Sequence, residues 1–121
     1  FRRVLFRSHG YVKSVEKFYN SNSIYVQPSA TEGFGIEVLE AMSCGLPVVV
    51  SDGAGAHELV IDSGIVVEKR NPQYIAQAIH YLKTNPEECT DMALKGIELA
   101  SYFTWPKIQE RYISLWKDLL Q

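Results

Sequence analysis

Short apolar runs separated by turn residues recur along the first half of the chain, and they predict β-strands. Such runs lie at 24–26, 48–50 and 64–67, and the run at 48–50 is apolar at every position. A uniformly apolar run is typical of a strand buried on both faces of a parallel sheet. A further short strand is predicted at 4–6.

Apolar residues spaced three and four apart predict helices between these strands. We expect helices at 14–19 and 35–43 and a single helical turn at 58–61. Gly45 stands where the C-terminal cap of the second helix is expected, and Pro47 follows it, so this helix should end there.

The second half of the chain is predicted to be helical. Asn-Pro pairs at 71–72 and 85–86 each place a capping residue and a proline at a helix start. Thr-Trp-Pro at 104–106 is expected to open the last helix. The last helix carries one wide apolar stripe of Ile108, Tyr112, Leu115, Trp116 and Leu119. This order predicts the fold class: an α/β, Rossmann-like, doubly wound parallel sheet with C-terminal helices.

The composition is ordinary for one α/β domain with its own core. The chain has 121 residues, of which 46% are hydrophobic and 21% charged, and its net charge of −2 gives no reason to expect nucleic acid as a partner. No apolar run approaches the roughly 20 residues of a membrane span. Cys44 and Cys89 are interpreted as unpaired thiols in a reducing cytoplasm, although spacing alone leaves a disulfide open.

The first eight residues look unlike a natural N-terminus. They lack an initiator Met, carry three arginines and have no signal-peptide layout. We therefore expect 1–8 to be a truncation or foreign junction, and 9–121 to form the domain.

Two glutamates and a glycine-rich turn supply the candidate chemistry. Glu32 and Glu40 stand eight positions apart, and Gly33 and Gly35 lie where the predicted helix opens. Free amides at a helix start bind phosphate, and carboxylates accept hydrogen bonds from hydroxyls. A nucleotide sugar carries both phosphates and hydroxyls and so fits these groups. The alternative is that both glutamates are surface acids beside a common Gly-x-Gly turn.

Alternation of strands and helices also predicts where the turns meet. The turns at Gly10, 32–35 and 52–55 each follow a strand, so they should share the carboxyl edge of the sheet, where ligands bind. Helical geometry is expected to place Glu40 beside Ile36 on the buried side, where it would need hydroxyl partners.

The segment 28–49 resembles the donor-site signature of retaining glycosyltransferases with the GT-B fold, which has two glutamates separated by seven residues. Pro-Ser before Glu32 and Ala-Met-x-x-Gly-x-Pro-Val after Glu40 match too. Gly-Tyr-Val at 10–12 resembles the nucleobase loop, Glu58 the glutamate after the next strand, and Phe-Thr-Trp at 103–105 the start of the closing helix. The resemblance covers residues 9–117.

The resemblance implies a role for each matching residue. The family transfers a glycosyl unit from a nucleoside diphosphate sugar to an acceptor with retention, and generally uses no metal and no cofactor. By this resemblance Glu32 is catalytic and binds the sugar hydroxyls, and Glu40 binds the ribose. The sugar and the distal phosphate are held by the amides of Gly33, Phe34, Gly35 and Ile36. Backbone atoms at Tyr11 and Val12 contact the base.

The resemblance also implies a missing N-terminal domain that binds the acceptor, since this chain matches the C-terminal, donor-binding half of a GT-B fold. An Arg and a Lys that neutralise the diphosphate would lie upstream of Gly10, so the chain alone should be inactive. The final aromatic stripe, including Trp105, is expected to pack rather than to form a sugar platform, with part of it exposed as an interface to that domain.

Two other functions stay open: a non-catalytic nucleotide-sugar-binding module and a sugar-nucleotide epimerase. His57 is expected to be a hydrogen-bonding loop residue rather than an acid–base catalyst. A cytoplasmic location is expected, and peripheral membrane association of the full-length enzyme stays open. The sugar, the nucleotide and the acceptor are not specified by these residues.

Overall fold

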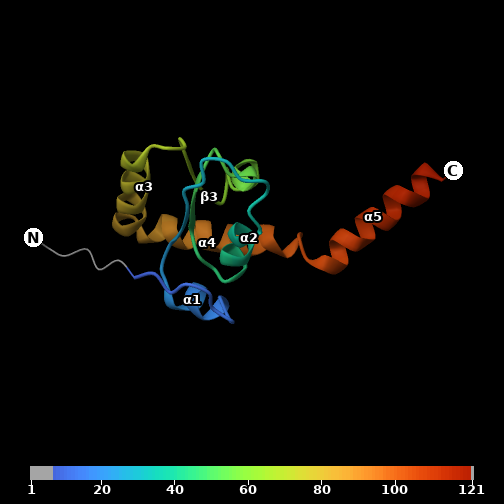
Figure 1. Ribbon diagram of the computed structural model, residues 1–121, viewed down its shortest axis with the longest axis horizontal. Helices are drawn as coiled ribbons and strands as arrows, with labels where there is room; N and C mark the ends of the chain where they lie inside the picture. The colour runs from blue at the N-terminus through green and yellow to red at the C-terminus, as the bar shows by residue number, and fades with distance from the viewer. Residues whose placement is uncertain (1–6, 121) are drawn as a thin grey trace, which may run out of the picture.

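A three-stranded parallel sheet forms the centre of the computed structural model. The structure, drawn in Figure 1, describes residues 7–120. The strands are β1 (Tyr25–Gln27), β2 (Val48–Ser51) and β3 (Gly64–Val67), and β2 lies between the other two. Val49 of β2 is in register with Val26 and Ile65. The predicted strand at 4–6 lies outside the described residues.

Helices follow the strands and then complete the chain. They are α1 (Glu16–Ser21), α2 (Ile36–Ser43), the short 3-10 helix η1 (Gly55–Glu58), α3 (Pro72–Thr84), α4 (Pro86–Ser101) and α5 (Trp105–Leu119). The predicted α/β fold with a parallel sheet and C-terminal helices is confirmed.

Successive side chains of β2 enter two different cores. Val48 and Val50 pack with α2 and the end of α4, whereas Val49 packs with Ala78 and Leu82 of α3. Helices therefore cover both faces of the sheet (Figure 1). All four residues of β2 are buried, as the uniformly apolar run predicts.

The predicted capping residues lie at the end of α2 and at the start of α3. The amide of Gly45 donates to the carbonyl of Met42 at 2.9 Å, and the amide of Leu46 donates to that of Ala41 at 3.1 Å. This pair of bonds satisfies the last carbonyls of α2. Asn71 caps α3 by accepting a bond from the Tyr74 amide.

Asn85 departs from its predicted role as a side-chain cap of α4. Its side-chain amide donates backwards to the carbonyl of Tyr81 at 2.8 Å, and makes no capping bond to α4. Since only one residue separates α3 from α4, the side chain closes the first helix instead of opening the second.

Two short helical segments lie away from their predicted positions. The helix predicted at 14–19 begins later, at Glu16, and Asn22 extends its end by donating to the Phe18 carbonyl at 2.6 Å. The turn predicted at 58–61 forms earlier, as η1. The Ala56 amide bonds to the carbonyl of Phe34 at 2.7 Å, and this tertiary contact fixes where η1 begins.

Helix α5 leaves the body of the protein and projects into solvent (Figure 1). None of its residues is buried, and Trp105 and Trp116 are 82% and 59% exposed. Lys107 donates to the carbonyl of Ser101 at the end of α4, but no element of the described chain covers the aromatic residues of the stripe. The prediction that these aromatic residues pack is therefore wrong within this chain, whereas the predicted exposure of part of the stripe is confirmed. Among the described residues, no helix has the length and apolarity to span a membrane.

Two loops at the carboxyl edge of the sheet approach so closely that a glycine is required between them. A Cβ atom added to Gly55 would lie 1.9 Å from the carbonyl oxygen of Gly33, and one added to Gly53 would lie 2.2 Å from that of Ser29. Backbone atoms cannot move aside as a flexible side chain can. The loop after β1 and the loop after β2 are thus packed main chain against main chain.

We predict that Gly55→Ala lowers the free energy of unfolding by about 1–3 kcal/mol, the usual cost of forcing extra atoms into a packed region. Gly33→Ala is the matched control, because an added Cβ there meets no atom within 4 Å. Urea denaturation of both variants measures the difference. Equal stability of the two variants would contradict the close packing.

Candidate functional site

The loop after β1 and the loop after β2 meet at the carboxyl edge of the sheet, as predicted. The Glu32 amide donates to the carbonyl of Gly53 at 2.9 Å. Ser51, the last residue of β2, donates its hydroxyl to the carbonyl of Ser29 at 2.6 Å. These bonds hold the glycine turn in one position relative to the sheet.

Glu32 lies over the start of α2. A Cβ atom placed on Gly35 would be 4.0 Å from the carboxyl carbon of Glu32. The Glu32 Oε2 atom accepts bonds from the Ser29 hydroxyl, at 2.6 Å, and from the side-chain amide of Gln27. The bond from Ser29, followed by that from Gln27, lowers the pKa of Glu32, so the group is an ionised acceptor at neutral pH.

Unpartnered amides surround the start of α2. The amides of Gly33, Phe34 and Gly35 donate to no other described residue, and Ile36, the first helical residue, has no acceptor inside its own helix. Gly35 has a φ of 86°, which only glycine adopts without strain, and this angle turns the chain into the helix. Gly33, Phe34 and Ile36 are exposed, whereas Gly35 is buried.

Glu40 is exposed, which corrects the prediction that it shares a buried side with Ile36. Ile36 is itself 57% exposed. The buried residues of α2 are instead Val38, Ala41 and Met42. Met42 lies against Gly96 of α4, so the helix that covers α2 determines which of its faces is buried.

Tyr19 of α1 contacts the Glu40 side chain directly. Its hydroxyl donates to Glu40 Oε2 at 3.1 Å, and its own side chain is buried. Burial, followed by the bond to Glu40, raises the pKa of Tyr19, so the hydroxyl keeps its proton and serves as a donor. Glu40 is therefore a bonded surface group rather than a free surface acid.

Tyr25 connects the surroundings of both glutamates. Burial, followed by the negative charges of Glu37, Glu32 and Glu40, raises the pKa of Tyr25 to about 12. The Tyr25 hydroxyl donates to Gln27, which bonds Glu32. The Tyr25 ring meets that of Tyr19, which bonds Glu40, at 5.8 Å between centroids.

Other candidate residues lie apart from this group or have structural roles. Tyr11 is 92% exposed and Val12 half-buried, and among residues 7–120 the loop that holds them makes no hydrogen bond to the glycine turn. His57 donates from Nδ1 to the carbonyl of Ala54 at 2.7 Å, which agrees with the predicted hydrogen-bonding role. Glu58 is exposed.

The sequence reasoning missed Gln27 and Tyr19 and quoted Ser29 only as part of a motif. A signal for Gln27 exists in the strand pattern, since residues 25 and 27 of a strand point to the same side. A polar residue at 27 beside Tyr25 therefore marks that side as one that carries polar groups. No local signal pairs Tyr19 with a residue 21 positions away.

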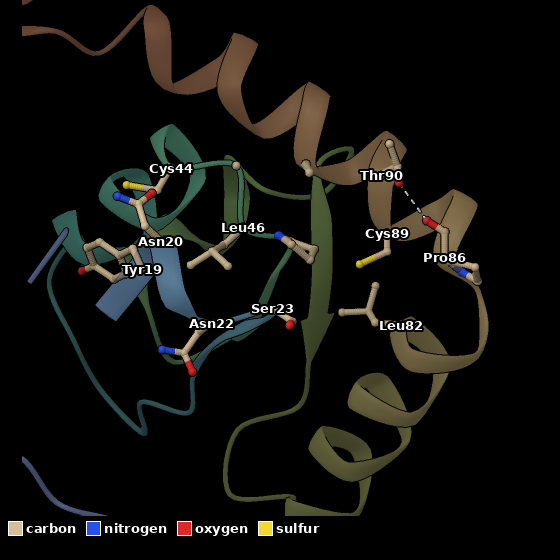
Figure 2. A pocket seen from close by; sticks show the side chains of 13 residues that line it. Tyr19, Asn20, Asn22, Ser23, Cys44, Leu46, Leu82, Pro86, Cys89 and Thr90 are labelled. Carbon is tan, nitrogen blue, oxygen red and sulfur yellow. Dashed lines mark hydrogen bonds between the residues drawn. The ribbon is translucent and has the colours of Figure 1, made fainter. Parts of the chain in front are cut away.

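A separate open hollow of about 470 Å³ lies at the opposite edge of the sheet (Figure 2). Ser23 and Pro47, which line it, precede β1 and β2, so it adjoins the amino ends of the strands. Cys44 and Cys89 also line it, and both are free thiols. This hollow is distinct from the site formed by the glycine turn.

Metal-binding side chains do not gather in the part of the chain that the structure describes. Across residues 7–120, no group of three or more His, Cys, Asp or Glu residues is arranged to hold a metal ion. The groups assembled at the glycine turn are one ionised carboxylate and a set of backbone amides. They suit hydroxyls and anionic oxygens.

Comparisons with known proteins agree with this arrangement. The chain is 36% identical over 95 residues to an uncharacterized glycosyltransferase of Methanocaldococcus jannaschii, covering 77% of this chain and 27% of that protein. Sucrose-phosphate synthase from Thermosynechococcus elongatus superposes with a TM-score of 0.79 at 28% identity, over 88% of this chain and 27% of that one. The chain thus spans about a quarter of the length of these relatives.

A third likeness concerns the fold alone. The Anabaena HepE protein, solved in complex with UDP-glucose, superposes with a TM-score of 0.76 at 23% identity, over 84% of this chain and 29% of that one. The family model described as "Glycosyl transferases group 1" matches residues 3–98. With its Rossmann-like sheet and the glycine turn at the carboxyl edge, this chain belongs to the group 1 glycosyl transferases.

Proposed function

We propose that this chain is the donor-binding half of a retaining GT-B glycosyltransferase and binds a nucleoside diphosphate sugar at the glycine turn. In this proposal Glu32 accepts hydrogen bonds from the sugar hydroxyls, and Glu40 binds the ribose. The amides of 33–36 hold the sugar and the distal phosphate. Backbone atoms at Tyr11 and Val12 contact the base.

The observation that carries the proposal is the position of the Glu32 carboxylate over Gly35, beside amides that have no partner. An ionised acceptor and several donors at one helix start match a ligand that has hydroxyls next to a diphosphate. The solved complex of HepE with UDP-glucose supports the choice of ligand class.

Transfer requires the bond between the anomeric carbon and the phosphate oxygen to break, with the electron pair leaving on the diphosphate. The acceptor oxygen forms the new bond to the anomeric carbon on the same face, and its proton passes to the departing diphosphate. Amides at the start of α2 stabilise the departing negative charge, since that end of a helix is partially positive. Glu32 holds the sugar in place during this exchange.

The acceptor site is assigned to a second domain of a longer protein. The stretch that matches covers only 27% of the Methanocaldococcus jannaschii relative, and α5 presents an uncovered apolar face that suits such a domain. Trp105, Tyr112 and Trp116 lie on that face. In this proposal they contact the acceptor-binding domain rather than sugar.

We predict that the two glutamates affect different parts of the ligand. Glu40→Ala should weaken binding of both UDP and UDP-glucose about tenfold to hundredfold, the cost of a lost charge-assisted hydrogen bond. Glu32→Ala should leave UDP binding unchanged and remove the extra affinity that glucose provides. Titration calorimetry measures both, with exposed Glu98→Ala as the control; equal effects of the two variants on both ligands would reject the assignment.

Binding of the sugar should be insensitive to pH across the neutral range. The bonds from Ser29 and Gln27 lower the pKa of Glu32 below the ordinary glutamate pKa of about 4.3. Its carboxylate therefore stays ionised throughout the neutral and mildly acidic range. UDP-glucose has no group of its own that titrates between pH 8 and pH 5, so the ratio of its dissociation constants for Glu32→Ala and for the unaltered chain should be constant over that range and fall only as the pH drops through the lowered pKa. A fall of this ratio between pH 7 and pH 6 would contradict the lowered pKa of Glu32.

The isolated chain should form no glycosylated product, whereas the longer protein should transfer the sugar. In that protein, Glu32→Gln should lower kcat about 100-fold or more, the size of effect expected for a lost positioned charge. Mass spectrometry of donor and acceptor after incubation measures transfer. Conversion of the donor without any acceptor would instead indicate an epimerase, and transfer by the 121 residues alone would refute the division of roles.

A further inference from the structure

A chain of hydrogen bonds runs along one side of β1 and ends on Glu32. The Tyr25 hydroxyl donates to Gln27 Oε1. The Gln27 Nε2 group donates to the Glu32 carboxylate and, at 3.0 Å, to the hydroxyl of Ser29. That hydroxyl in turn donates to the same Glu32 oxygen, Oε2.

The chemistry of these groups fixes the direction of each bond. An ionised carboxylate can only accept, so the Gln27 amide must turn its NH₂ group toward Glu32 and its carbonyl away. The carbonyl then faces Tyr25, whose hydroxyl must donate. Because burial and nearby carboxylates raise the pKa of Tyr25 to about 12, this hydroxyl keeps its proton at neutral pH.

Both donors act on Oε2, which leaves the other carboxylate oxygen open. Among the described residues, Oε1 of Glu32 accepts no hydrogen bond. The bonds to Oε2 fix the rotation of the carboxyl group and so the direction in which Oε1 presents its lone pairs. An acceptor fixed in advance loses less entropy when a ligand binds than one that must first be ordered.

We propose that Gln27 is a positioning residue that holds Glu32 Oε2, so that Glu32 Oε1 accepts a hydrogen bond from a hydroxyl of the donor sugar. This role rests on the function proposed above for Glu32. Gln27 itself touches no substrate. Tyr25 orients its amide, and Ser29 provides the second bond to the same oxygen.

The test compares UDP-glucose with UDP on variants of the 121-residue chain. Gln27→Met keeps an unbranched side chain of similar length and removes both donors and acceptor. We expect it to lower the ratio of the UDP to UDP-glucose dissociation constants about tenfold, the size of one hydrogen bond to a charged group, with UDP binding changed less than twofold. Gln73→Met, at an exposed position in α3, is the matched control and should change neither value.

A ligand-free measurement separates positioning from general damage to the fold. In NMR titrations that follow the Glu32 carboxyl carbon, Gln27→Met should raise the pKa of Glu32, because a donor to the ionised form is lost. If Gln27→Met does not fold, Gln27→Glu keeps the shape and places a like charge against Glu32. It should raise the same pKa and also lower the ratio.

The outcomes distinguish this inference from the proposed function. Loss of the glucose preference in both Glu32→Ala and Gln27→Met, with UDP binding intact, supports both. If Glu32→Ala loses the preference and Gln27→Met retains it, Gln27 has no positioning role. If the wild-type chain shows no preference for UDP-glucose over UDP, the assignment of Glu32 fails and this inference fails with it. Equal weakening of both ligands by Gln27→Met would assign it a structural role only and overturn the inference.

Discussion

The main-chain contact between the loop after β1 and the loop after β2 is the constraint on which the site depends. Gly55 and Gly53 leave room for carbonyl oxygens of the neighbouring loop where any side chain would collide. The amides of Glu32 and Ala56 bond across the same junction. A carboxylate and a helix start are thereby fixed relative to one another by backbone, which moves less than side chains do.

Side chains from two earlier elements complete what the backbone begins. Gln27 and Ser29, at and just after the end of β1, bind Glu32, and Tyr19 of α1 binds Glu40. Both Gln27 and Tyr19 also contact Tyr25. Tyr25 therefore lies between the donors of the two glutamates, although each glutamate accepts hydrogen bonds from its own donors. One small polar region can therefore present different acceptors to different parts of one extended ligand.

The sequence predicted those features that depend on neighbours along the chain. The buried strand at 48–50, the cap at Gly45 and the meeting of two loops follow from local pattern and from alternation of elements. The buried side of α2 was predicted wrongly because contact with α4, more than 50 residues later, selects it. The exposure of the apolar stripe on α5 could not be predicted from its spacing, since periodicity identifies an apolar face but not which element covers it.

The register of β1 determines whether Gln27 can reach Glu32. Gln27 lies opposite Val50, and Val26 lies opposite Val49. Because side chains alternate along a strand, a slip by one residue would point valine at Glu32 and bury the glutamine amide among aliphatic groups. A misaligned strand would therefore leave the Glu32 carboxylate without its bond from Gln27. The geometry of the glycine turn and the alignment of β1 with β2 thus depend on the same residue, Gln27.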